Sequence, residues 1–333
     1  MKATGRISKY QVFFLCLILT AGLAPVVGPT LSYGQESGFP SKAIEIVVPF
    51  GPGGSLDIGA RVLTEPLSQA LKVSVVIKNQ AGGGGLMGAT SFFNAKPDGY
   101  TVLAASPAAI ISNVQLSKNP TFDPRKDFLP LGMVGISPIS LSVSSKVPFK
   151  TFDEFVQFGK KNPGKLRGSF SSPGGETHIM LLSILKETKI DSKVIPYTTT
   201  GENVAALLGG HVDWGTASLV SRVPYLKSGE MRCLLLTHQS PEAPGVPAGP
   251  DIGLDSVSTN LWLGLFVHAK TPKPAYDKLV SAVKATLNDA KVKDSLTKAG
   301  YIAKYEDPQE FSKTINKDWN IFSEVLKEAG LLK

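Results

Sequence analysis

The sequence contains little cysteine and little histidine, with 2 cysteines and 4 histidines among 333 residues. The two cysteines, Cys16 and Cys233, are too few for a disulfide scaffold or a cysteine-rich zinc site. The histidines do not show the close spacing of metal ligands. We therefore expect no metal and no other cofactor.

A block of basic residues is also missing. The chain has 35 Lys and Arg against 27 Asp and Glu, a net charge of +8, but the basic residues are scattered. A scattered excess is typical of a solvated surface, so we expect no nucleic-acid partner. Hydrophobic residues make up 42% of the chain, which excludes disorder. The length predicts about two domains.

Residues 1–34 have the pattern of a secretory signal peptide. They carry three basic side chains and no acid, and an apolar run over residues 12–23 follows the basic start. The run is short and early for a membrane span, so the alternative to a cleaved signal peptide is an uncleaved anchor. Ser32 and Gly34 are small residues that suit cleavage before Gln35. We expect the mature chain to be exported to the periplasm with a single cysteine.

Strand and helix patterns alternate along the rest of the chain, which predicts an α/β fold with parallel sheets. The pattern divides into two halves, which we expect to be two doubly wound domains. Ligands of such sheets bind beyond the carboxyl ends of the strands. The last part predicts two helices, over about 276–287 and 308–326. Strands are predicted over 44–48, 73–77, 101–105, 138–144, 168–171, 194–197, 212–216, 233–237 and 261–267.

The glycine-rich loop of residues 49–57 lies between a predicted strand and a predicted helix. The amide groups at a helix N-terminus favour an anion, and glycine lets a ligand approach the backbone. The loop matches neither the P-loop nor the dinucleotide-binding pattern. Asp57 would either cap the helix, which we favour, or contact the ligand.

Residues 171–178 occupy the equivalent place in the second half. A serine hydrolase would use Ser171 or Ser172 as nucleophile and His178 as base, but the nucleophile-elbow pattern is absent. We expect no enzyme activity, and a role for His178 in ligand contact or at the helix start. In a third loop, residues 196–201, three threonine hydroxyls either donate to a polar ligand or cap a helix.

The chain resembles the tripartite tricarboxylate transporter substrate-binding proteins, the TctC/Bug type, over about residues 38–333. The resemblance rests on an ordered set of motifs: Val47-Val48-Pro49-Phe50-Gly51-Pro52-Gly53-Gly54-Ser55-Leu56-Asp57, Pro97-Asp98-Gly99-Tyr100-Thr101, Asn162-Pro163-Gly164-Lys165-Leu166, Pro196-Tyr197, Leu207-Leu208-Gly209-Gly210 and Lys227-Ser228-Gly229.

The resemblance implies a type II periplasmic binding protein fold, with two doubly wound α/β domains and a ligand cleft between them. The first domain would comprise residues 38–135 plus 262–333, and the second residues 136–261. Crossover strands would lie near 131–140 and 258–266.

The resemblance also implies a function. Such proteins capture a small organic carboxylate outside the inner membrane and deliver it to a two-component inner-membrane permease, driven by an ion gradient. A monomer is expected. The alternative is a ligand-sensing periplasmic adaptor for a membrane sensor kinase. The residues expected to bind the ligand are Phe50, Gly51, Gly53, Gly54, Ser55, Asp57, Ser106, Ser171, Gly174, Gly175, Thr177, His178, Tyr197, Thr199, Thr200 and Ser218.

Some positions depart from the family pattern. Many relatives carry a Thr-His pair where Ala108 and Ala109 stand, and often an Asp where Ala217 stands. The loss of that Asp makes an α-amino ligand less expected. Glu176 adds a negative charge that opposes an anion, so we expect it to point to solvent or to meet a neutral or positive end of the ligand.

Overall fold

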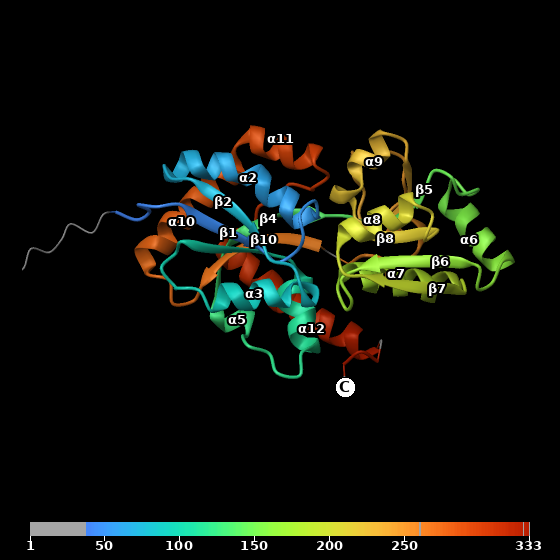
Figure 1. Cartoon of the computed structure of the whole chain (residues 1–333), viewed down its shortest axis with the longest axis horizontal. Helices are drawn as coiled ribbons and strands as arrows, with labels where there is room; N and C mark the ends of the chain where they lie inside the picture. The colour runs from blue at the N-terminus through green and yellow to red at the C-terminus, as the bar shows by residue number, and fades with distance from the viewer. Residues whose placement is uncertain (1–37, 260, 329, 333) are drawn as a thin grey trace, which may run out of the picture. The chain divides into compact units, whose positions relative to one another are not determined.

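The computed structural model describes residues 38–259, 261–328 and 330–332. The predicted signal peptide, residues 1–34, lies outside the described residues. The described strands form two five-stranded sheets, each assembled around parallel strands and completed by antiparallel ones (Figure 1).

The first sheet has the strand order β2-β1-β3-β10-β4. β1 runs parallel to β2 and β3, whereas β10 runs antiparallel to β3 and β4. The strands are β1 (Ile44–Val48), β2 (Val75–Asn79), β3 (Thr101–Ala105), β4 (Phe128–Ser137) and β10 (Leu261–His268).

The second sheet has the order β7-β6-β8-β5-β9, in which β6 is parallel to β7 and β8, and β5 is antiparallel to β8 and β9. The prediction of parallel sheets was therefore wrong, because both are mixed. The alternation of strands and helices predicted the parallel pairs of β1 and β6 correctly, but it did not show that the remaining strands pair antiparallel. The strands are β5 (Ile139–Ser144), β6 (Leu166–Ser171), β7 (Ser192–Tyr197), β8 (Trp214–Ser218) and β9 (Met231–Leu236).

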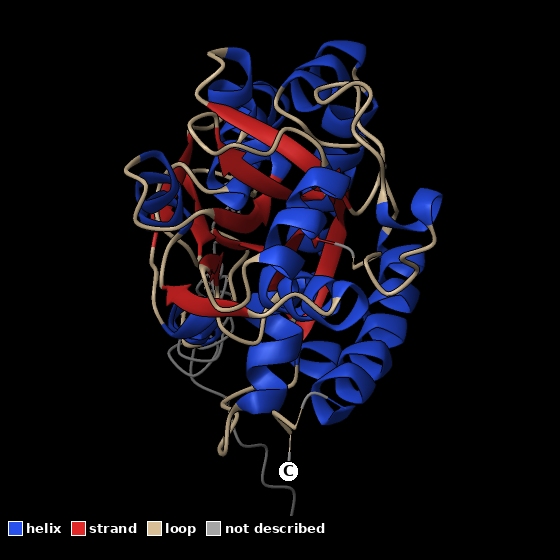
Figure 2. Ribbon diagram, turned by 90° about the vertical axis from the view of Figure 1, so that its right-hand side faces the viewer, coloured by secondary structure: helices blue, strands red, loops and turns tan. Residues whose placement is uncertain are grey.

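The two faces of the first sheet are covered by different helices. Ile44, Ile46 and Val48 belong to the core cluster shared with α2 (Ser55–Leu71) and α10 (Lys273–Asn288). Val47 belongs to the cluster shared with α3 (Leu86–Phe93) and α12 (Pro308–Glu328). This alternation is the period of a strand buried on both faces. Figure 2 shows the strands in red between the blue helices.

The second sheet is covered in the same manner. α6 (Phe152–Lys161) and α7 (Glu176–Thr188) share a core cluster with the fully buried Trp214. α8 (Thr200–Leu208) forms a separate small cluster together with half-buried residues of α9 (Val223–Lys227). The chain passes from the first sheet to the second at Pro138, between β4 and β5. This passage falls within the predicted crossover, while the domain boundaries stay a prediction.

Shorter helices complete the described residues. The C-terminal part has three helices rather than the predicted two, because α11 (Ala290–Lys298) lies between α10 and α12. Only Val292 and Leu296 of α11 are buried, which leaves too weak an apolar stripe to detect, and the Asp289 carboxylate caps its first turn. The others are α4 (Asn113–Leu116), α5 (Pro124–Asp127), η1 (Gly83–Gly85), η3 (Leu219–Ser221), η4 (Gly249–Ile252) and a π-helical turn, η2 (Ala108–Ser112).

Among the described residues, no helix is both long enough and apolar enough to cross a lipid bilayer.

Candidate ligand-binding cleft

Five loops from both sheets meet around a cavity of about 40 Å³. The loops follow the carboxyl ends of β1, β3, β6, β7 and β8, which is where open α/β sheets bind ligands. The cavity is lined by Phe50, Gly54, Ser55, Leu56, Ser106, Ala108, Ser171, Ser172, Glu176, Thr177, Thr198, Thr200, Ser218 and Leu261.

The N-terminus of α2 forms one wall of the cavity. Gly54 is its N-cap, and no side chain caps this end, so the amide groups of the first turn are available to an anion. Asp57 accepts a hydrogen bond from the Gly53 amide at 2.9 Å and pairs with Arg61 and Asn79. Burial alone would raise the pKa of Asp57, but the bonds from Arg61, Gly53 and Asn79 lower it. Asp57 thus fixes the loop through the Gly53 amide and does not line the cavity.

The N-terminus of α7 forms the opposite wall, again with a glycine N-cap, Gly175, and no side-chain cap. Ser172, just before it, adopts a left-handed conformation with φ of 64°. Its hydroxyl is buried and has no hydrogen-bond partner among the described residues. A strained backbone and an unpaired buried polar group each cost free energy, and such features concentrate at functional sites. Ser172 lines the cavity and is absent from the binding residues predicted from the sequence.

His178 positions this loop and does not line the cavity. Its Nδ1 accepts a hydrogen bond from the Gly174 amide at 3.1 Å, and its ring stacks on Phe170 at 4.0 Å. Burial lowers the pKa of His178, so the ring is neutral near pH 7. No hydrogen bond joins it to Ser171 or Ser172 in the described structure, which leaves the hydrolase hypothesis without its nucleophile–base contact.

The threonine loop combines both roles that its sequence left open. Thr199 is the N-cap of α8 and forms a capping box with Glu202. Thr198 and Thr200, which flank it, line the cavity. Tyr197 instead packs against the small apolar cluster under α8. The loop therefore caps a helix with one hydroxyl and presents two others to the cavity.

Glu176 is the one acidic side chain among the lining residues that the structure describes. It is 2% exposed, and its Oε1 accepts a hydrogen bond from the Ala108 amide at 2.7 Å. Burial raises the pKa of Glu176 to about 7, while the amide of Ala108 and the hydroxyl of Ser106 oppose that rise. The first of the two alternatives for Glu176, that it points to solvent, was wrong, because its partner amide lies 68 residues away in the sequence, where the local pattern could not show it. The second, that it meets a neutral or positive end of the ligand, stays a prediction.

Small residues let the two sides of the cavity approach closely. A Cβ at Gly175 would lie 3.0 Å from the Cβ of Ala108, and one at Gly85 would lie 2.7 Å from that of Ala109. Larger side chains at Ala108 and Ala109 would not fit this arrangement. Ala108 and Ala109 thus lie at a tight contact between η2 and its neighbours.

The structure brings half of the predicted site residues together. Eight line the cavity: Phe50, Gly54, Ser55, Ser106, Ser171, Thr177, Thr200 and Ser218. The other eight do not line it: Gly51, Gly53, Asp57, Gly174, Gly175, His178, Tyr197 and Thr199. The lining residues that sequence reasoning missed are Leu56, Ala108, Ser172, Glu176, Thr198 and Leu261.

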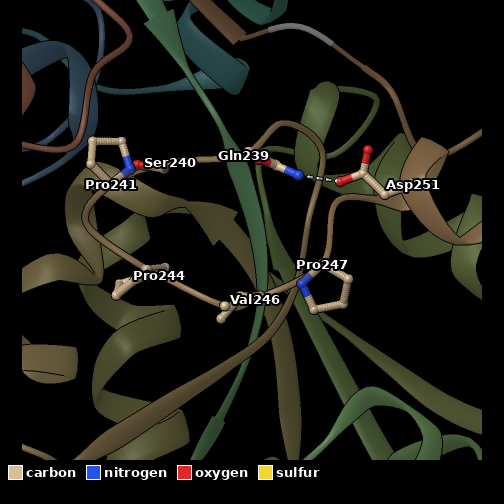
Figure 3. Close-up of a pocket in the computed structure, with 9 residues that line it drawn as sticks. Gln239, Ser240, Pro241, Pro244, Val246, Pro247 and Asp251 are labelled. Carbon is tan, nitrogen blue, oxygen red and sulfur yellow. Dashed lines mark hydrogen bonds between the residues drawn. The ribbon is translucent and has the colours of Figure 1, made fainter.

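Two larger hollows lack these features. One, of about 550 Å³, lies within the loop after β9, where Figure 3 shows proline side chains and a hydrogen bond from Gln239 to Asp251. The other, of about 660 Å³, lies between α7 and α12 and is largely apolar. Neither includes an uncapped helix N-terminus or an unpaired buried hydroxyl among its described residues. The described residues also contain no cluster of three or more His, Cys, Asp and Glu that could hold a metal ion.

Cys233 lies on β9, as predicted, but it is half-buried rather than buried. Burial around its sulfur raises the pKa of the thiol to about 12. Because the thiolate is the reactive form, native protein lacking residues 1–34 should react with a maleimide at least roughly 100-fold more slowly than the unfolded protein. Labelling rates with and without denaturing urea test this. Equal rates would contradict the expectation.

Comparisons with known proteins identify the family and the fold of this chain. Residues 59–331 match TctC, the tripartite tricarboxylate transporter family receptor. The protein BugT of Bordetella pertussis is 30% identical over 278 residues, which cover 82% of this chain and 81% of BugT.

Two solved structures share the fold. MatC of Rhodopseudomonas palustris, solved with bound malate, is 27% identical with a TM-score of 0.78, and the match covers 86% of this chain and 100% of MatC. Rpa4515 of R. palustris, solved with adipate, is 25% identical with a TM-score of 0.83, and the match covers 88% and 98%. The expected type II periplasmic binding fold is confirmed. The chain belongs to the tripartite tricarboxylate transporter family of receptors.

Proposed function

We propose that this receptor captures a small organic carboxylate in the cavity between the two sheets and delivers it to a two-component inner-membrane permease. One observation carries the proposal: two uncapped helix N-termini and the unpartnered Ser172 hydroxyl line the same cavity. Such donors bind an anion without a basic side chain. None of the described lining residues is Lys, Arg or His.

The relatives support the chemical class of the ligand. MatC binds malate and Rpa4515 binds adipate, and both are carboxylates. In this chain the hydroxyls of Ser55, Ser172 and Thr200 add neutral hydrogen-bond donors beside the helix N-termini. Ordered water can extend such contacts with almost the enthalpy of a direct hydrogen bond.

The cavity must widen before a ligand enters. A volume of about 40 Å³ holds only a few water molecules. We infer that the two parts move apart and close again on the ligand, with domains of residues 38–135 plus 262–333 and 136–261. A ligand drives closure to the extent that it binds the closed state more tightly.

The cellular setting follows from the same proposal. Residues 1–34 would direct export and be removed, and the mature receptor would act in the periplasm as a monomer. The permease would recognise the closed, loaded form. A role as adaptor for a sensor kinase uses the same cleft, and the choice of membrane partner separates the two roles.

Native mass spectrometry of gently purified mature protein tests the proposal. We expect an excess mass of roughly one to a few hundred daltons, in the size range of small carboxylates, that is lost on denaturation. If the protein carries no ligand, calorimetry with a broad panel of carboxylates replaces the first test. Failure to bind any of them would contradict the proposed function. Capture of a kinase ectodomain in place of a permease would support the adaptor.

A further inference from the structure

We propose that Glu176 makes this cleft select carboxylates that carry an N–H donor, an amide or an ammonium, at the end opposite the carboxylate. The inference rests on the proposed function and names the class of ligand within it. Dicarboxylates, such as those bound by MatC and Rpa4515, should bind poorly here.

The first step is the position of the side chain. Glu176 is the first residue of α7 and belongs to the cavity wall, while its Oε1 is held by the amide of Ala108 on the other side. At 2% exposure it cannot turn to solvent without opening the cleft. Its carboxylate therefore occupies an amide donor that a second ligand carboxylate would otherwise use.

The second step is charge. The described residues of the cavity wall supply no basic side chain to neutralise Glu176. Its charge is met by its own backbone amide, the amide of Ala108 and the hydroxyl of Ser106, all of them neutral dipoles. A second carboxylate beside it adds like-charge repulsion in a buried place, whereas an N–H group supplies the missing donor.

The third step is the place of the ligand carboxylate. The Ser172 hydroxyl lies on the same wall as Glu176, just before α7. On the opposite wall the free donors are the first turn of α2 and the neighbouring Thr200 hydroxyl, which would lie 3.8 Å from a Cβ at Gly54. A ligand with its carboxylate at these donors directs its other end toward Glu176. Glu176 then supplies the acidic counter-ion for an ammonium group at that end.

The surroundings of Glu176 contain few other charges. Asp318 on α12 raises the pKa of Glu176 further. On α7 itself, His178 is neutral near pH 7. Arg167, on the neighbouring β6, is paired with Asp213. The neighbouring strands β5 and β8 and the turn η2 contain no charged residue. Glu176 is therefore the titrating group of the cavity near neutral pH.

The test uses matched ligand series on the mature protein. Each series contains a dicarboxylate, its monoamide and the ω-amino acid of the same length, such as succinate, succinamate and 4-aminobutanoate, then the glutarate and adipate series. In at least one series, calorimetry should give an N–H member that binds about tenfold or more tightly than the dicarboxylate.

The variant Glu176→Gln separates charge from shape. Gln keeps an oxygen that can accept from Ala108, so the fold should be retained. The dicarboxylate should gain about tenfold and the ω-amino acid should lose about tenfold, while the amide changes little. The control is Glu154→Gln in the first turn of α6, an exposed residue that also accepts a backbone amide. It should leave all affinities unchanged.

A pH series gives a readout that does not depend on the variant. An ammonium ligand requires ionised Glu176, whose pKa is about 7 in the free protein. Its affinity should therefore fall as the pH drops from 8 to 6, over a range in which the ligand does not titrate. Dicarboxylate affinity should rise over the same range.

Three results would overturn the inference: dicarboxylates that bind as tightly as the N–H members in every series, equal shifts of all ligands in Glu176→Gln, or flat pH profiles. Each of these leaves the proposed function intact, because carboxylates still bind. A protein that binds no member of any series and no other carboxylate overturns the proposed function as well.

Discussion

Replacing Gly54 by valine should weaken carboxylate binding about 100-fold or more and shift the melting temperature by only a few degrees. Gly54 has φ of −75° and ψ of 166°, a conformation open to every residue type. A Cβ there would lie 3.5 Å from the Gly51 carbonyl oxygen and 3.8 Å from the Thr200 Oγ1, which is ordinary contact. The valine methyl groups would instead fill the small cavity and cover the amide donors of α2.

The matched control for this prediction is Gly201→Val. Gly201 lies in the first turn of α8, next to the cavity residue Thr200, but a Cβ there would meet no atom within 4 Å. The affinity of the Gly201→Val variant for the carboxylate should stay within about threefold of the native value. Calorimetry on both variants, with any carboxylate that binds the native protein, decides the matter. Unchanged affinity in Gly54→Val would place the binding site elsewhere.

Replacing Trp214 by alanine should lower the free energy of unfolding by about 3–5 kcal/mol. Trp214 is fully buried, packs edge-on against Phe155 at 5.3 Å between ring centres, and donates a hydrogen bond to the Ser192 hydroxyl at 3.1 Å. Gly168 faces the ring so closely that a Cβ there would lie 2.5 Å from it. Alanine would leave a large cavity, into which the close-packed neighbours relax only in part.

The control is Trp319→Ala, which makes the same substitution at a less buried position. Trp319 is half-buried on α12 and contacts the guanidinium of Arg125 at 4.0 Å from the ring centre. Its loss should cost only about 1–2 kcal/mol. Urea titrations followed by circular dichroism compare the two variants. Similar losses in both would contradict the distinction between a core tryptophan and a surface one.

Many strands and helices were predictable, because short stretches of sequence carry their residue patterns. The β-branched run over residues 44–48 and the stripe of leucines in α2 identify a strand and a helix within a few residues of their observed bounds. The return direction of β10 depends on pairing with β3 and β4, strands more than a hundred residues earlier in the chain. α11 buries two side chains only and is fixed by the Asp289 cap.

The features of the cleft also differ in whether the local sequence could predict them. The glycine and threonine loops were predictable, because helix N-termini after strands present amide and hydroxyl donors wherever they occur. The burial of Glu176 and the strained, unpartnered Ser172 were not. The burial of Glu176 results from the approach of η2 to the start of α7, two segments that are distant in the sequence. The left-handed backbone of Ser172 has no signal in its residue type, because serine seldom adopts it. The sequence thus indicates which loops line the cavity, while the contacts across it depend on tertiary structure.

The position of β10 determines the order in which the two sheets can form as the chain emerges. The second sheet draws all its strands from the continuous segment 139–236, whereas β10 enters the middle of the first sheet from residues 261–268. As the chain emerges N-terminus first, the second sheet can assemble as soon as its last strand is free. The first sheet must wait with a gap between β3 and β4, and closing it requires contacts of long sequence separation, which form slowly. The half of the protein that is made first is therefore the half that is finished last.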